Sequence, residues 1–421
     1  MKSSKIDDAI FSILFTRQKK LKRIALCALP PGALASVTSG LIENHAWASL
    51  TTLELPSTIR STDDLQVWHA AINAAHNLQK LIIRVSSITI APSGNVPLQG
   101  TTQNTPGALL STLFPALKET QKDKQLNTFA LRSLTLANTQ LLNAKDTIMN
   151  AIDFSRLVEL RLEHCSWDEC LFDFLAEAFK TSGCALRGLW LTTFDVHADH
   201  GLDKFLSSFS GLRKLYIRAT EEEFVGFDTS CLEGHRHSLE ELAIQSSFEC
   251  LCDPDRSEPR EAAPLLRVVA KFPRLKQFGL TAYFNISAGP TDHVADKIRS
   301  LLCHPTLQTL RIFNWPIIDP DDVDEGSADE YLEQLGSYID GRIIKPIVEK
   351  NADQQFPALI IGRFGGYCFQ EDHVQVDGPR YFKIGKYDGP DVFRIGETVA
   401  TGRKLQEVKG LVPASAMVDL D

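Results

Sequence analysis

One hydrophobic phrase, Leu-x-x-Leu-x-Leu with Ile or Phe at some positions, recurs along the chain. Its ten copies begin at Leu21, Leu50, Leu78, Leu131, Leu157, Leu186, Leu212, Leu239, Leu275 and Leu307. Successive copies are separated by 29, 28, 53, 26, 29, 26, 27, 36 and 32 residues. A weaker copy contains Phe356, Leu359 and Ile361. A spacing this regular predicts a repeat architecture rather than a series of separate domains.

Each phrase has the pattern of a β-strand, because apolar positions four and six alternate with varied residues at positions three, five and seven. The copy that begins at Leu157, for example, places Leu160 and Leu162 on one face of the expected strand and continues to Cys165 near position nine. Between the phrases, apolar residues recur at helical spacing over 64–77, 143–154, 168–180 and 290–302. The sequence therefore predicts alternating strands and helices.

This alternation resembles the leucine-rich repeat proteins, specifically their irregular long-repeat type with a helix after each strand. The resemblance covers about residues 21–362. It implies an α/β solenoid in the form of a horseshoe, with a parallel sheet on the concave side and helices on the convex side. A doubly wound sheet is the competing fold, but such sheets do not keep a fixed repeat length.

Four parts of the chain follow from this interpretation. They are an N-terminal cap helix over 1–20, the repeat array over 21–362, a C-terminal β cap over 363–410 and a flexible tail over 411–421. Two insertions interrupt the array, a Gly-, Pro- and Ser-rich loop over 91–107 and an acidic segment over 319–330, which a longer helix over 331–350 follows. In the cap, alternating apolar residues beside turn signals predict β-hairpins, with Tyr381 and Phe382 in one strand.

Composition and charge narrow the class of protein. The chain has 421 residues, of which 43% are hydrophobic and 23% charged, which is typical of a globular protein. A net charge of -9 argues against general nucleic-acid binding. We expect no membrane span and no secretory signal. Nine scattered cysteines fit a reducing compartment, so we expect a cytoplasmic or nuclear protein.

One segment suggests metal chemistry. Asp195-Val-His197-Ala-Asp199-His200 resembles the metal-binding motif of the metallo-β-lactamase family, which implies a zinc-dependent hydrolase as the alternative function. Its first position, Asp195, should be histidine, and the preceding phrase is in register with the other repeats. The competing interpretation is that Asp199 or a neighbour caps a helix that starts near Gly201.

Two further clusters fit a metal site less well. Cys231, His235, His237, Cys250 and Cys252 lack the usual Cys-x-x-Cys spacing of zinc sites. The acidic insertion has Val323 where a calcium loop requires an oxygen ligand. We therefore expect a protein without a metal, a cofactor or enzymatic activity.

The position of a residue within its phrase predicts the face of the strand on which its side chain lies. Side chains that point away from the leucines are expected on the concave face of the sheet. The candidate binding residues on that face are Arg161, Trp190, Lys214, Tyr216, Arg218, Arg311 and Phe313. Trp190 and Tyr216 occupy the same position of adjacent phrases, and we expect both to be exposed. Trp, Tyr and Arg carry much of the binding energy at protein interfaces. The alternative is that these aromatic rings only cover the sheet.

Together these features predict a non-catalytic interaction scaffold that holds a protein partner with acidic and apolar groups. Repeat proteins of this irregular type, especially fungal ones, often follow an F-box and present substrates to a cullin-type ubiquitin ligase. The resemblance therefore implies a substrate-recognition adaptor. No F-box helical motif is recognisable in the first 50 residues, and the sequence predicts no oligomeric state.

Overall fold

The computed structural model divides the chain into two compact units. The first comprises Met1–Leu212 and Arg218–Glu223, and the second Arg213–Ile217 and Phe224–Asp421. The residues that the structure describes are 20–25, 46–55, 62–84, 113, 129–139, 141, 151–163, 165, 170–194, 201–219, 228–246, 262–280, 293–312, 337, 339–346, 358–361 and 380–382.

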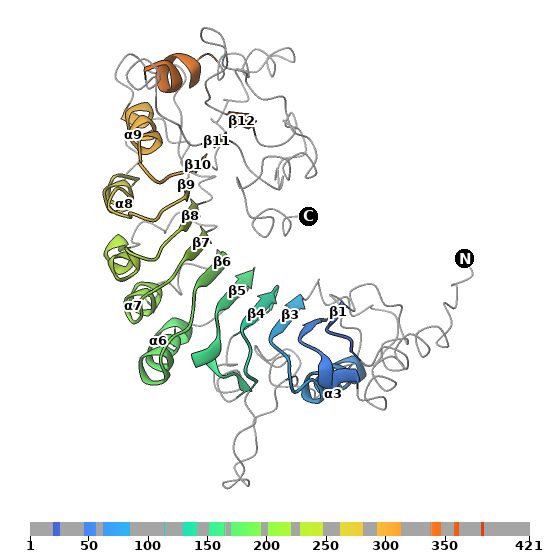
Figure 1. Ribbon diagram of the computed structural model, residues 1–421. Coiled ribbons are helices and arrows are strands. Elements are labelled where there is room, and N and C mark those ends of the chain that lie inside the picture. Colours follow the sequence, from blue (N-terminus) through green and yellow to red (C-terminus); the bar gives the residue numbers. More distant parts are fainter. Residues whose placement is uncertain are drawn as a thin grey trace, which may run out of the picture. The chain divides into compact units, whose positions relative to one another are not determined.

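The described part of the first unit contains six strands, which pair in parallel and in chain order (Figure 1). They are β1 (Arg23–Ala25), β2 (Thr52–Glu54), β3 (Lys80–Arg84), β4 (Ser133–Ala137), β5 (Glu159–Glu163) and β6 (Gly188–Phe194). Each strand begins two residues after the first leucine of a phrase. The predicted strand positions are therefore confirmed in this unit.

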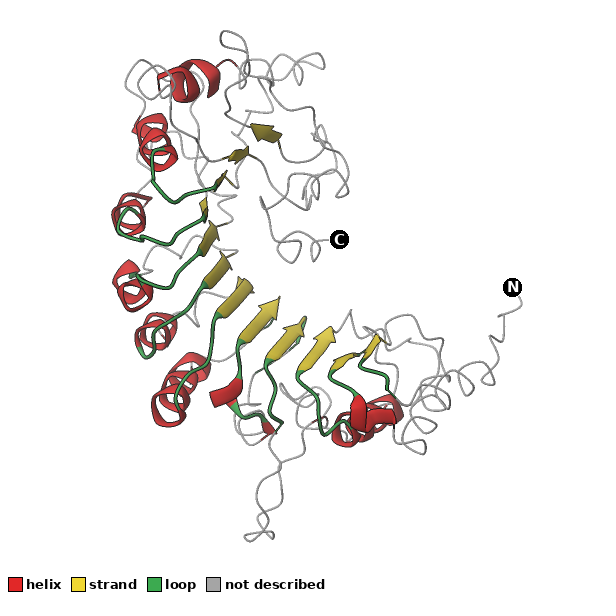
Figure 2. Cartoon of the chain, viewed as in Figure 1, coloured by secondary structure: helices red, strands yellow, loops and turns green. Residues whose placement is uncertain are grey.

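Helical segments of the first unit connect these strands and lie on one side of them (Figure 2). They are η1 (Ala46–Ser49), α3 (Thr62–Ala74), η3 (Phe154–Arg156), α6 (Cys170–Ser182) and α7 (Leu202–Ser207), of which η1 and η3 are 3-10 helices. The helices expected over 64–77 and 168–180 correspond to α3 and α6. Most of the helix expected over 143–154 lies outside the described residues.

The second unit repeats the same arrangement in its described residues. Its strands are β7 (Lys214–Ala219), whose last two residues belong to the first unit, β8 (Glu241–Ser246), β9 (Gln277–Leu280), β10 (Thr309–Ile312), β11 (Ala358–Ile361) and β12 (Arg380–Phe382). β7 neighbours β8, the pairs from β8 to β11 are parallel, and β12 pairs antiparallel with β11. β7 to β10 also start two residues after their leucines, and β11 contains Leu359 and Ile361 of the weaker phrase.

The helical segments of this unit are η6 (Thr229–His235), α8 (Ala262–Val269), α9 (His293–Leu302) and the π-helix η8 (Ile339–Ile344). The helix expected over 290–302 corresponds to α9, and Tyr381 and Phe382 lie in β12, as the alternating pattern predicted. The cap helix expected over 1–20 lies outside the described residues except for Lys20. The insertions 91–107 and 319–330 and the tail 411–421 also lie outside them.

The leucines of successive phrases align across the first unit's sheet. Leu81, Leu134, Leu160 and Leu189 form one row from β3 to β6, and Ile83, Leu136, Leu162 and Leu191 form a second. All eight are buried. Burial of each such side chain contributes about 1.5–3 kcal/mol, so these rows form the core beneath the sheet.

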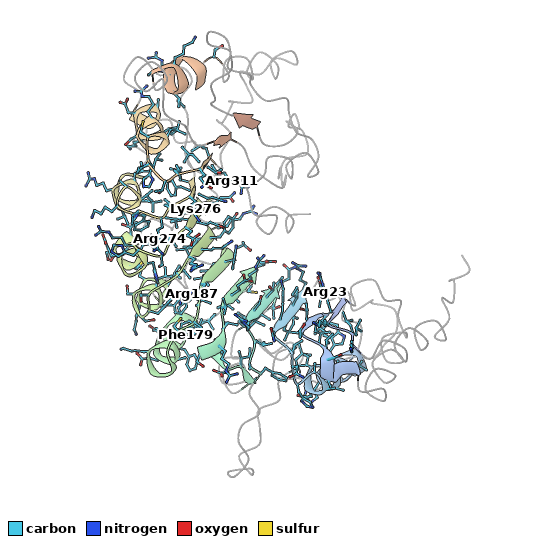
Figure 3. All side chains as sticks on the ribbon, viewed as in Figure 1. Arg23, Phe179, Arg187, Arg274, Lys276 and Arg311 are labelled. Carbon is cyan, nitrogen blue, oxygen red and sulfur yellow. The ribbon has the colours of Figure 1, made fainter. Side chains whose placement is uncertain are left out.

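Phenylalanine rings fill the space between the helical segments of the first unit. Phe179 of α6 lies at the centre of the group and is labelled in Figure 3. Its ring centroid is 5.4 Å from that of Phe205, 5.7 Å from Phe209 and 6.2 Å from Phe154. Aromatic pairs at such separations stabilise a core by about 0.5–1.5 kcal/mol beyond the area they bury. The rings therefore fix the helical segments to one another.

Candidate binding face

The residues at phrase positions three, five and seven form the face of the sheet opposite the leucine rows, which we call the variable face. In the first unit the strand register aligns them in three rows. Row five runs through Ala25, Glu54, Ile82, Thr135, Arg161 and Trp190. Row three ends in Glu159 and Gly188, and row seven contains Arg84, Ala137, Glu163 and Thr192.

Trp190 lies back over its own strand. Gly188 precedes it by two residues, and side chains two apart on a strand point to the same face. A Cβ atom at position 188 would overlap the six-membered part of the indole. The absence of a side chain at Gly188 therefore provides the space in which the ring lies. Trp190 is only 8% exposed, so the expectation of an exposed tryptophan is wrong.

Arg161 of β5 lies directly beside Trp190 in the register. Its guanidinium carbon is 4.2 Å from the centre of the indole ring. A cation over the face of an aromatic ring gains about 0.5–2 kcal/mol, depending on how far water is excluded. Arg161 remains partly exposed. The pair is thus an aromatic ring that is held by the sheet and a planar cation stacked on it.

Ion pairs connect the variable-face charges of the earlier strands. Arg84 lies 3.1 Å from Glu54 and 4.0 Å from Glu163, and Arg23 lies 3.9 Å from Glu54. The pair between Arg84 and Glu163 extends from β3 to β5 across β4, where the register places the small side chain of Ala137. The ion pairs therefore connect the charged side chains of β1, β2, β3 and β5 to one another.

Small side chains occupy the variable face of β4. Ser133, Thr135 and Ala137 are all buried. Longer side chains of β3 and β5 flank them, and the Ser133 hydroxyl donates to the Glu159 carboxylate at 3.3 Å. The variable face therefore has two parts. Around β4 it is covered by longer side chains that form ion pairs, and on β5 and β6 it is formed by Arg161 and Trp190.

The second unit places its candidate residues differently. Lys214 pairs with Glu241 at 2.9 Å, and the Tyr216 hydroxyl donates to the Gln245 side chain at 3.2 Å. Lys214 and Tyr216 are partly exposed. Arg311 aligns with Gly279 of β9 and is only 7% exposed. Arg311 is therefore buried, contrary to the expectation of an accessible binding residue.

Two candidate residues remain. Arg218 lies in β7, belongs to the first unit and is partly exposed. Phe313 lies outside the described residues. Trp190 and Tyr216 fall in different units, the first and the second respectively.

The suggested metal ligands are mostly outside the described residues. These are Asp195, His197, Asp199, His200, Cys250 and Cys252. Cys231 and His235 are buried in η6, and His237 is exposed. Within the described residues, no group of three or more His, Cys, Asp or Glu side chains could hold a metal ion.

Position nine of two phrases carries a buried polar group that bonds to the backbone. The Cys165 thiol donates to the Leu136 carbonyl at 3.2 Å, and the Thr139 hydroxyl donates to the Ala137 carbonyl at 3.0 Å. Burial raises the pKa of Cys165 to about 12. Because the thiolate is the reactive form of cysteine, Cys165 stabilises the end of its strand and is a poor nucleophile.

No model of a known protein family matches the chain, and no curated protein matches it either. Across the described residues, none of the helices has both the length and the apolar character that crossing a membrane requires.

Proposed function

We propose that this chain is a leucine-rich repeat protein, a horseshoe-shaped solenoid that acts in the cytoplasm or nucleus and binds a protein partner on its concave sheet. The regular relation between phrase and strand supports the repeat interpretation. Leucines recur at the buried positions, while the residues of the variable face differ from one repeat to the next. A surface of this kind can be specific for a partner without disturbing the core.

The observation that carries the proposal is the stacked pair of Arg161 and Trp190. The indole is fixed over Gly188, so little side-chain freedom remains to be lost when a partner binds. The guanidinium presents N–H donors in a planar arrangement that matches a carboxylate. We infer that a carboxylate of the partner binds Arg161, while the edge of the indole supplies apolar contact.

The test compares Arg161→Glu with Arg132→Glu. Both substitutions reverse one arginine of the first unit, but Arg132 is exposed just before β4, outside the variable face. Trp190→Ala is unsuitable, because removal of a buried ring lowers stability as well as binding. Tagged proteins would be recovered from cell extract, bound proteins would be quantified by mass spectrometry, and the affinity of the main partner would then be measured with purified components.

We expect Arg161→Glu to weaken binding of that partner by about tenfold or more, equivalent to about 1.4 kcal/mol. Arg132→Glu should bind like the unaltered chain. Equal binding by all three proteins would show that the stacked pair is not the site.

We also propose, on the resemblance alone, that the scaffold serves as a substrate-recognition subunit of a cullin-type ubiquitin ligase. Recovery of a cullin in the same purification would support this role, provided that the Arg161→Glu protein still recovers the cullin when it no longer binds the main partner. If no cullin is recovered, the proposal of a ligase subunit is wrong, and only the proposal of a protein-binding scaffold remains.

A further inference from the structure

Exposed basic side chains gather where the chain enters the strands of the second unit. We call this group the basic flank. It consists of Arg213, Arg236, Lys271, Arg274 and Lys276. All five lie in segments that lead from a helical element into β7, β8 or β9, and Figure 3 labels Arg274 and Lys276. Because β8 and β9 are parallel and β7 neighbours β8, these segments reach the sheet at its amino-terminal edge.

The sequence after the strands of this unit has the opposite charge. Residues 247–261, which follow β8, contain five acidic and two basic residues. Residues 313–330, which follow β10, contain seven acidic residues and no basic one. The basic flank therefore stands out against a chain whose net charge is -9.

Two acidic residues beside the flank form ion pairs with three of its five basic residues. Glu240 accepts a hydrogen bond from Lys276 at 2.9 Å and lies 3.8 Å from Arg213. The bond from Lys276 is the main cause that lowers the pKa of Glu240, so this carboxylate stays ionised at neutral pH. Glu233 lies 3.5 Å from Lys271. These pairs order the bases of neighbouring repeats on one surface.

Arg236 and Arg274 are the bases that remain. Both are exposed, and neither forms an ion pair within the part of the chain that the structure describes. Five bases against two acids leave an excess of positive charge at the flank. A guanidinium is suited to bind a carboxylate through two parallel hydrogen bonds. The flank thus offers two guanidinium groups that have no ion-pair partner among the described residues and lie in a positive local field.

We propose that the basic flank binds a short acidic segment of another protein. This surface lies in the second unit, whereas the Arg161 and Trp190 pair lies in the first. A nucleic acid fits it less well, because a long polyanion would also meet the acidic remainder of the chain. A second copy of the chain is disfavoured as well, since two copies repel each other through their net negative charge.

The test measures binding of a short fluorescein-labelled polyglutamate peptide by fluorescence anisotropy at low salt. We compare the full chain with Arg236→Glu combined with Arg274→Glu. The matched control combines Lys22→Glu with Arg132→Glu, which reverses two exposed bases of the first unit and changes the net charge equally. Circular dichroism checks that all three proteins are folded.

We expect the flank variant to bind the peptide about tenfold more weakly than the control, because each charge reversal replaces attraction by repulsion at an exposed site. Binding by the unaltered chain should weaken as salt screens these charges. Equal loss in both variants would overturn the proposal, because it would reflect total charge only.

Two further outcomes would also overturn it. One is tighter binding of a labelled oligonucleotide than of polyglutamate, which would assign the flank to nucleic acid. The other is self-association at low salt in sedimentation experiments that the flank variant abolishes, which would make a second copy the occupant.

Discussion

The two faces of the first unit's sheet are built from the same strands but carry different kinds of interaction. The leucine face is uniform, since leucines or isoleucines align from strand to strand and phenylalanine rings pack between the helical segments. The variable face holds ion pairs and a stacked cation, and its residues change at every strand. The difference suggests that the leucine face supplies most of the stability and leaves the variable face free to determine specificity.

Trp190 is the exception to this division. It points to the variable face, yet it is buried, with 8% of its surface exposed against 3% or less for the leucine rows of the opposite face. Its ring rests over Gly188 and beneath the Arg161 guanidinium. Trp190 therefore contributes to stability and to the shape of the variable face at the same time, and the substitutions below are chosen to separate these contributions.

The largest expected effect comes from two adjacent residues of β5. Leu160 points to the leucine face and is 2% exposed, while Arg161 points to the variable face. Leu160→Ala should lower the free energy of unfolding by about 2–5 kcal/mol, because it leaves a cavity in a packed core. Arg161→Ala should cost about 1 kcal/mol or less, through loss of the cation–π contact. Urea denaturation followed by circular dichroism measures both values.

Similar losses in the two variants would contradict the division of labour between the faces. A third variant, Leu162→Ala, lies on the same face as Leu160 and serves as a control for position within the strand. It should resemble Leu160→Ala.

A smaller effect is expected from Gly188→Ala. The added methyl group would meet the Trp190 ring and displace it from the sheet, which should cost about 1–3 kcal/mol of unfolding free energy. In a Trp190→Leu background the ring is absent, so the same substitution should be neutral or slightly stabilising, since alanine loses less backbone entropy on folding than glycine. Urea denaturation of all four proteins tests this change of sign.

An equal cost in both backgrounds would show that the space at Gly188 serves the backbone rather than the indole. Near-ultraviolet circular dichroism provides a second readout. Gly188→Ala should change the aromatic signal in the Trp190 protein by more than it does in the Trp190→Leu protein.

The positions of the strands could be predicted from the sequence with good accuracy. The leucine phrase repeats, and a shift of one residue would turn every leucine of a strand to the wrong face, so the register was strongly determined. The helix boundaries were less accurate. The expected helix 168–180 is Cys170–Ser182, and the expected helix 64–77 is Thr62–Ala74, because helix ends depend on local capping more than on apolar spacing.

The arrangement of the variable face was only partly predictable. Phase correctly placed Arg161 and Trp190 side by side in one row, but phase does not determine how much neighbouring side chains cover a residue. Trp190 is buried because Gly188 has no side chain. The spacing Gly-x-Trp in the sequence could have indicated that the ring lies over the glycine. The pair of Arg84 and Glu163 connects strands that are not adjacent, so only the small residue between them, Ala137, could have indicated it.

The ion pairs of the variable face provide the smallest expected effect and the closest test of the comparison. Arg84 and Glu163 lie 4.0 Å apart, and the Arg84 side chain is partly exposed to water. Exposed pairs of this kind contribute about 0.2–1 kcal/mol, so a double-mutant cycle of Arg84→Met and Glu163→Gln should give a coupling at the lower end of that range. The shorter pair of Arg84 and Glu54, at 3.1 Å, should give a larger coupling in a parallel cycle with Glu54→Gln.

Coupling well above 1 kcal/mol in the Arg84 and Glu163 cycle would mean that the variable face stabilises the sheet as the leucine face does. In that case its charges would be fixed by folding, and substitutions there could not change a partner's affinity without also destabilising the sheet. Weak coupling in this cycle, together with a large cost for Leu160→Ala, would instead show that the charged residues of β3 and β5 can vary between repeats while the leucines beneath them hold the strands in place.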